Sequence, residues 1–180
     1  MAILKIARMG HPILFGRAES VELPRSAEIR RLVSDMIETM LDANGAGLAA
    51  PQVHVPLRLF VFRVPPERAG SGPEERPVPV TVVINPQIEF LGEERVLRWE
   101  GCLSIPGLRA AVPRHARIRY VGIDCEDQPI GAVASGFHAG VVQHEYDHLD
   151  GILYPMRMQD FSRFGFTEEL ARVGAMEGAG

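Results

Sequence analysis

Residues 143–151 read QHEYDHLDG, in which His144 and His148 stand four positions apart and Glu145 directly follows the first. On a helix, positions i and i+4 lie on one face about one turn apart, so both imidazoles can reach the same cation and Glu145 lies beside it. The alternative is a solvated helix face that carries two histidines by chance. The stretch predicts a metal-binding helix, on which the rest of the fold depends.

The metal-facing side of this helix is expected to be its buried side as well. Gly136 opens the segment 137–149, in which Phe137 and Val141 share a face with the two histidines. A metal site on that face would be shielded from bulk water.

A second helix is expected near the N-terminus. Apolar residues recur at helical spacing from Ile29 to Leu41, Ser26 is placed to cap the first turn, and Asn44-Gly45 is placed to end the helix. Further along the chain, runs of β-branched and aromatic residues between turn residues predict antiparallel strands at 57–64, 78–85, 87–91, 95–99 and 117–124.

A chain of 180 residues with 46% hydrophobic residues can form one buried core, so we expect a single domain over residues 1–180. Residues 65–77 are rich in proline, glycine and charge and are expected to form a surface loop between two strands. Near the end, Thr167 to Val173 is a short helix candidate with Thr167 as its N-cap, and residues 174–180 are expected to be disordered.

The overall charge excludes some classes of function. A net charge of −4 gives no global basic field, so bulk binding of nucleic acid is not expected, and a small polar or peptide ligand is favoured. Two cysteines, Cys102 and Cys125, do not make a disulfide framework, which favours a reducing cytoplasm. We expect neither a signal peptide nor a membrane span of about 18 to 20 apolar residues.

A catalytic site of this type needs a third protein ligand beside the two histidines. Tyr154 occupies the position where metzincins have a histidine, and Glu168 lies in a charged tail segment. Cys102, next to a glycine after a strand, could supply a thiolate, although a lone cysteine is more often a small buried hydrophobe. The other histidines lack partners at ligand spacing and are expected to be structural or on the surface; they are His11, His54, His115 and His138.

Three stretches together resemble the signature motifs of peptide deformylases, in the family's order: GAGLAAPQ at 45–52, EGCLS at 100–104 and QHEYDH at 143–148. On its own, the first would be read as a tight connection whose glycines allow unusual backbone angles. The resemblance covers residues 3 to about 157. It implies an α+β fold in which antiparallel sheets pack around the helix that carries the H-E-x-x-H motif. It also implies a metal-dependent hydrolase that removes the N-formyl group from the N-terminal formylmethionine of new polypeptides.

The resemblance also assigns roles to residues of this chain. Cys102, His144 and His148 are the implied metal ligands and Glu145 the proton shuttle. Gln52 and the Leu103 amide are the implied oxyanion donors, and Gly47 and Arg109 the positions that meet the substrate backbone. The implied metal is one divalent ion, natively Fe²⁺, which Zn²⁺, Ni²⁺ or Co²⁺ can replace. The implied partners are N-formylmethionyl peptides. A longer C-terminal helix can contact the ribosome in the family, and the short tail here leaves that contact open.

Elementary chemistry points the same way. A divalent cation lowers the pKa of its bound water, so hydroxide can attack the formyl carbon while Glu145 moves the proton. An H-E-x-x-H endopeptidase would share this chemistry, and a non-catalytic protein could use the metal as a staple. Tyr154, which stands where metzincins have a histidine, disfavours the endopeptidase. Gln52 and Glu145 would have no purpose in a protein that binds the metal only for structure. The methionine side chain is expected to lie near Val141.

Overall fold

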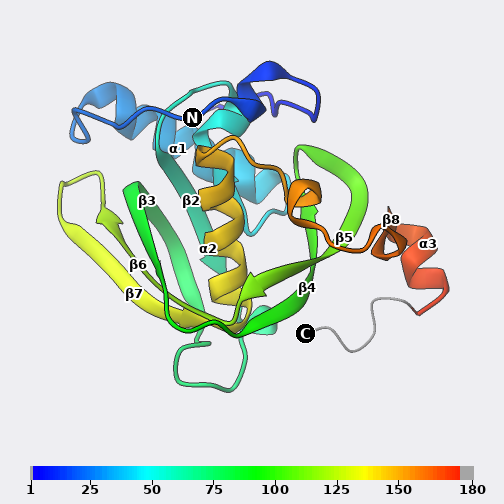
Figure 1. Ribbon diagram of the computed structural model, residues 1–180. Helices are drawn as coiled ribbons and strands as arrows, with labels where there is room; N and C mark the ends of the chain where they lie inside the picture. The colour runs from blue at the N-terminus through cyan, green and yellow to red at the C-terminus, as the bar shows by residue number, and fades with distance from the viewer. Residues whose placement is uncertain (1, 175–180) are drawn as a thin grey trace.

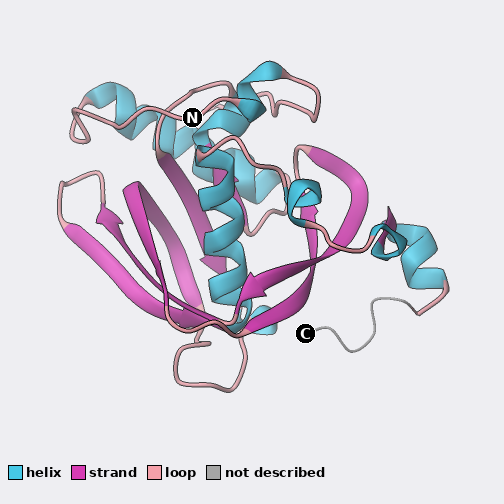
Figure 2. Ribbon diagram, viewed as in Figure 1, coloured by secondary structure: helices cyan, strands magenta, loops and turns pink. Residues whose placement is uncertain are grey.

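Helix α2 (Gly136–Leu149) stands at the centre of the fold, with a sheet on either side of it (Figure 1). The computed structural model describes residues 2–174. Figure 2 shows strands curving around this helix while the other helical segments lie at the periphery. The expected α+β fold, with antiparallel sheets around the helix of the metal motif, is confirmed.

The two sheets divide the strands unequally. All strand pairs are antiparallel. The larger sheet has the order β1 (Gly47–Ala49), β2 (Leu59–Val64), β3 (Val78–Phe90), β6 (Arg117–Ile123) and β7 (Pro129–Ser135). The smaller sheet has the order β4 (Arg95–Cys102), β5 (Ile105–His115) and β8 (Phe164–Phe166).

Several strands differ from those expected. The two strands predicted at 78–85 and 87–91 are one strand, β3, whose register shifts between Ile84 and Gln87. At this irregularity Asn85 has a φ of 51°, and its side chain bonds both backbone groups of Val21, so the bulge ties down the N-terminal segment. Strands β1, β5, β7 and β8 were not expected; residues 45–52, which contain β1, were read as a tight connection. Prolines and glycines interrupt the sequence signal of β5 and β7, and β8 has only three residues.

Helix α1 (Ala27–Asp42) confirms the N-terminal prediction. The Ser26 hydroxyl accepts a hydrogen bond from the Ile29 amide at 3.2 Å, and Asn44 leaves the helix with a φ of 55°. The apolar stripe packs against the larger sheet and includes the buried residues Val33, Met36 and Met40.

The C-terminal helix α3 (Thr167–Arg172) starts one residue earlier than predicted. Thr167 is its first helical residue, so its assignment as N-cap was wrong. The Thr167 hydroxyl instead donates to the Gly107 carbonyl at 3.2 Å, because β8 pairs with β5 and brings this residue to it. Of the tail expected to be disordered, residues 175–180 lie outside the described part of the chain.

Helix α2 is buried on nearly every side because both sheets cover it. His138, on the side away from the metal motif, stacks on Phe62 and hydrogen-bonds the Tyr120 hydroxyl at 3.1 Å. Burial lowers the pKa of His138 to about 4, so it is a neutral structural residue. Cys125 lies in the turn after β6 rather than in a strand. None of the helices formed by residues 2–174 has the length and hydropathy to cross a membrane.

Candidate active site

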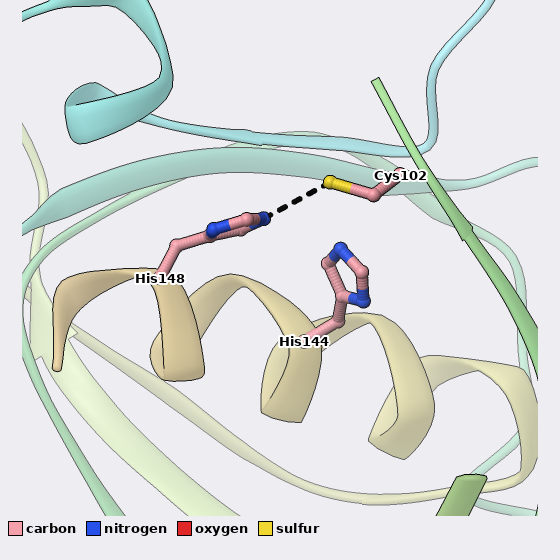
Figure 3. Close-up of side chains that lie close together, drawn as sticks. All are labelled: Cys102, His144 and His148. Atoms are coloured by element: carbon pink, nitrogen blue, oxygen red, sulfur yellow. Dashed lines mark hydrogen bonds between the residues drawn. The ribbon is translucent and has the colours of Figure 1, made fainter. Parts of the chain in front are cut away.

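Three potential metal ligands converge between the two sheets. Cys102 ends β4, whereas His144 and His148 project from successive turns of α2 (Figure 3). Their ligand atoms lie within 4.8 Å of one another, and Cys102 Sγ is 3.2 Å from His148 Nε2. The alternative ligand, Glu168, is exposed on α3 and does not join the group.

A buried carboxylate orients the first histidine. Glu100 accepts a hydrogen bond from His144 Nδ1 at 2.8 Å, which leaves Nε2 of the same ring to face Cys102. Arg114 holds Glu100 in turn, through two bonds of 2.6 and 2.9 Å. Burial raises the pKa of Glu100, but Arg114 and His144 outweigh it and lower the pKa to about 2. Glu100 is therefore an anion that fixes the ring.

The same network continues through α2 to the segment that follows this helix in the chain. Asp147 accepts from Arg114 and also from Arg157, at 2.7 Å for the shorter bond to the latter. A chain of paired charges thus runs from Arg157 to His144. The sequence analysis assigned no role to Glu100, Arg114 or Asp147; the only local signal was the carboxylate two positions before Cys102.

Glu145 faces the cluster in an unusual environment. Its carboxylate passes close to Gly47 on β1, where any Cβ would collide with it. Its Oε2 has no hydrogen-bond partner among residues 2–174, and burial raises the pKa of Glu145 to about 7. A carboxylate with this pKa can both accept and return a proton near neutral pH.

Gln52 is oriented by its neighbours. Its Oε1 accepts from the Ala49 amide at 2.8 Å, so its NH₂ group turns toward Ser104 Oγ at 3.1 Å and Cys102 Sγ at 3.4 Å. Leu103 lies beside it in the two-residue turn between β4 and β5. The amide donor of Gln52 therefore points at the ligand cluster.

The donor set fits a divalent transition metal. One thiol and two imidazoles are ligands of such ions, and three protein ligands leave a further position for water or substrate. Burial lowers the pKa of His148 well below its usual value, which keeps this ring neutral, the form that binds a metal. Burial lowers the pKa of His144, but Cys102 and Glu100 outweigh it and raise the pKa well above its usual value, so this ring must release a proton to bind a metal. The hydrogen bond from Nδ1 to Glu100 leaves Nε2 as the nitrogen for coordination.

The cluster opens into a cavity of about 900 Å³. Apart from His148, every residue that the sequence analysis assigned to metal binding, catalysis or substrate binding lines this cavity. Phe137 and Val141 line it from α2, and residues of the 65–77 loop line it from outside both sheets. The structure thus brings together positions that lie up to about a hundred residues apart in the sequence.

Comparison with known proteins identifies the family. The family model for polypeptide deformylase matches residues 3–164. Peptide deformylase 2 of Ralstonia nicotianae is 51% identical over 168 residues, which are 93% of this chain and 94% of the relative. Peptide deformylase 1 of Xanthomonas campestris pv. campestris is 52% identical over 169 residues, which are 94% and 98% of the two chains.

Solved structures agree with these sequence matches. The peptide deformylase of Ehrlichia chaffeensis in complex with actinonin has a TM-score of 0.83 at 34% identity and covers 99% of each chain. The class I type b peptide deformylase of Acinetobacter baumannii bound to Met-Ala-Ser has a TM-score of 0.77 at 33% identity and covers 87% of this chain and 98% of that one. Sequence, fold and the grouping of the three motif segments around one cavity lead to a single conclusion: this chain belongs to the peptide deformylase family.

Proposed function

We propose that Cys102, His144 and His148 hold the metal with which this chain removes the formyl group from formylmethionyl peptides, and that Glu145, Gln52 and Leu103 carry out the reaction. The chain is a hydrolase of nascent formylated peptides, as its family is. The observation that supports the residue roles is the convergence of three potential ligands with Glu145 and Gln52 at one cavity. A divalent cation bound there lowers the pKa of a water molecule and so makes a nucleophile available near neutral pH.

Glu145 transfers the proton. Its carboxylate accepts a proton from the attacking water and then delivers it to the amine nitrogen that leaves as the C–N bond breaks. The pKa of about 7 suits both halves of this transfer. Gly47 provides the space in which the carboxylate sits.

Gln52 and Leu103 stabilise the charge that forms on the formyl oxygen. The Gln52 NH₂ group is already turned toward the cluster, and the Leu103 backbone N–H is the second donor. Because both donors are neutral and preorganised, they favour the oxyanion over the planar formyl group; removal of one such donor commonly costs about 2.7–4 kcal/mol of activation free energy.

The substrate backbone can pair with β1. This strand is at the edge of the larger sheet, pairs only with β2 among the described strands, and contains Gly47 at the cavity. An extended peptide can add to such an edge through backbone hydrogen bonds. Arg109 lies on the opposite side of the cavity, on β5, and the methionine side chain is placed near Val141.

Three peptides distinguish this function from the alternatives. Metal-loaded protein is incubated with formyl-Met-Ala-Ser, with acetyl-Met-Ala-Ser and with an unmodified long peptide. We expect formate from the first, far slower reaction with the second and no internal cleavage of the third. Internal cleavage would indicate an endopeptidase, and no reaction with any of the three would indicate a structural metal.

We further propose Fe²⁺ as the native metal, with Zn²⁺, Ni²⁺ or Co²⁺ as substitutes, and the cytoplasm as the location. A thiolate beside a redox-active ion is open to oxidation. The iron-loaded protein should therefore lose activity in air faster than the nickel-loaded protein, and equal stability of the two would contradict the iron assignment. Contact with the ribosome is not part of this proposal.

A further inference from the structure

The two proposed oxyanion donors lie on separate, short elements. Gln52 belongs to η2 (Ala50–Val53), a single turn of 3₁₀ helix that follows β1. Leu103 lies in the turn between β4 and β5. Because hydrogen bonds in a 3₁₀ turn have poor geometry, η2 does not fix its own position well. The placement of Gln52 relative to the β4–β5 turn therefore depends on contacts from elsewhere in the chain.

The side-chain contacts between these two elements all use the Gln52 NH₂ group. This group donates to Ser104 Oγ at 3.1 Å and approaches Cys102 Sγ at 3.4 Å. In the proposed reaction the same group donates to the formyl oxygen. It cannot keep its present partners and take on that role, so contacts that hold η2 during the reaction must come from other atoms.

Residues 7–9 supply such contacts through the backbone. The Ala7 amide donates to the Gln52 carbonyl at 2.8 Å, and the Met9 amide donates to the Ser104 carbonyl at 2.8 Å. Neither bond involves the Gln52 NH₂ group or the Leu103 amide, so both can persist while the oxyanion forms. Ala7 and Met9 do not line the cavity. They can act on the reaction only through the positions of the groups that they bind.

The 7–9 segment is itself fixed to the rest of the molecule. Ala7 is buried and packs in the same apolar cluster as Tyr154. Beyond the segment, the His11 ring lies edge-on to the ring of His54, the residue that follows η2, with centroids 4.7 Å apart. The Met9 side chain is 49% exposed, so Met9 is held through its backbone. The segment therefore forms a firm link between η2 and the β4–β5 turn.

We infer that Ala7 and Met9 are positioning residues, which hold Gln52 where it can stabilise the oxyanion together with Leu103. This inference rests on the proposed function, in which Gln52 and Leu103 donate to the same oxygen. A misplacement of about 1 Å can cost about 10²-fold in rate, so a weakened link should be measurable. The competing explanation is that residues 7–9 only complete the core.

Removal of the Met9 N–H tests the link. Met9→Pro deletes this donor and replaces a side chain that is half exposed. We expect kcat for formyl-Met-Ala-Ser to fall about tenfold while KM stays within about twofold of the parental value, because the oxyanion forms only in the transition state. Metal content and Tm are measured alongside, and the metal content should equal that of the parent protein.

Two further variants separate the lost bond from other effects of proline. Arg8→Pro is the matched control, because Arg8 is an exposed residue of the same segment whose amide donates to no group among residues 2–174. It should retain the parental kcat and KM. Replacement of Met9 by its α-hydroxy acid turns the 8–9 amide into an ester, which removes the N–H and keeps the side chain. This variant should reproduce the fall in kcat.

Combination with Gln52→Ala separates positioning from a purely structural role. In that background the link has no oxyanion donor to position, so Met9→Pro should lower kcat by no more than about twofold. A residue that only completes the core would lower kcat by the same factor in both backgrounds.

The outcomes are distinct from those of the proposed function. Three results would each overturn the inference and leave deformylation standing: parental kcat in both Met9 variants, an equal fall in Arg8→Pro, or an undiminished effect of Met9→Pro in the Gln52→Ala background. If the parent protein released no formate from formyl-Met-Ala-Ser, the proposed function would fail and this inference with it.

Discussion

At the scale of single residues, the proposed reaction depends most on Glu145. Its carboxylate is buried beside Gly47, and the pKa of about 7 reflects the loss of water more than any neighbouring charge. Replacement by glutamine keeps the shape and removes the proton transfer. Glu145→Gln should therefore keep its metal content and fold while formate release falls about 10²- to 10⁴-fold.

The control for this variant is Glu89→Gln, an exposed carboxylate of β3 paired with Arg119. It should retain parental activity. Parental activity in Glu145→Gln, with metal content verified, would remove the proton-shuttle role.

The pH dependence of turnover follows from the same residue. The proton-accepting form of Glu145 is the carboxylate, and because its pKa is raised, this form is lost as pH falls through about 7. A bound cation favours the carboxylate and moves this limb to lower pH. The rate should thus fall on the acidic side, with a midpoint between the ordinary value for glutamate and about 7. A pH–rate profile measures this, and a rate that rises on acidification would contradict it.

Gly47 gives a second residue-scale prediction. A methyl group at this position would occupy the space of the Glu145 carboxylate, which would have to move. A displacement of about 1 Å can cost about 10²-fold in rate, so Gly47→Ala should lose about that much of kcat. Gly16→Ala is the control, because the only nearby atom there is 4.0 Å from the added group. Equal activity of the two variants would show that Glu145 tolerates displacement.

At the scale of elements, the buried charges join β4, β5 and α2. Arg114 on β5 pairs with Glu100 on β4 and with Asp147 on α2. Arg114→Met would leave two buried carboxylates without their main partner, so the free energy of unfolding should fall by about 3–5 kcal/mol. Glu100, which orients the His144 ring, would be disturbed as well.

Denaturant unfolding measures this loss. The comparison variant is Arg119→Met, which removes an exposed pair with Glu89 and should cost about 1 kcal/mol or less. Equal losses in the two variants would show that the buried network does not hold the elements together.

At the scale of the whole molecule, the metal site links the two sheets. Cys102 belongs to the smaller sheet, and the histidines belong to the helix that packs on the larger one. A ligand that binds only the folded state stabilises it, so removal of the metal by a chelator should lower Tm by several degrees, and Zn²⁺ should restore it. We also expect one unfolding transition, in keeping with a single domain over residues 1–180.

Cys102→Ala should abolish most of the chelator effect, because one ligand is gone before the chelator is added. Calorimetry with parallel metal analysis tests both the parent protein and this variant. An unchanged Tm after verified loss of metal would mean that the site adds nothing to stability.

The sequence by itself determined the local features of this protein. Helical spacing placed His144 and His148 on one face of α2, and Ser26 predicted the start of α1, because helix periodicity and capping depend on neighbours a few positions away. The resemblance to a family supplied Cys102 and Gln52, which spacing alone left open. The structure brings both into contact with the histidine site.

Only the tertiary structure decided how distant segments meet. Arg114 and Asp147 become partners of Glu100 and His144 across separate elements, and the 65–77 loop becomes a wall of the cavity beside Phe137. Strand β5 forms in spite of its prolines because β4 pairs along its length. Such contacts depend on packing between residues that are far apart in the chain, so no local pattern in the sequence predicts them.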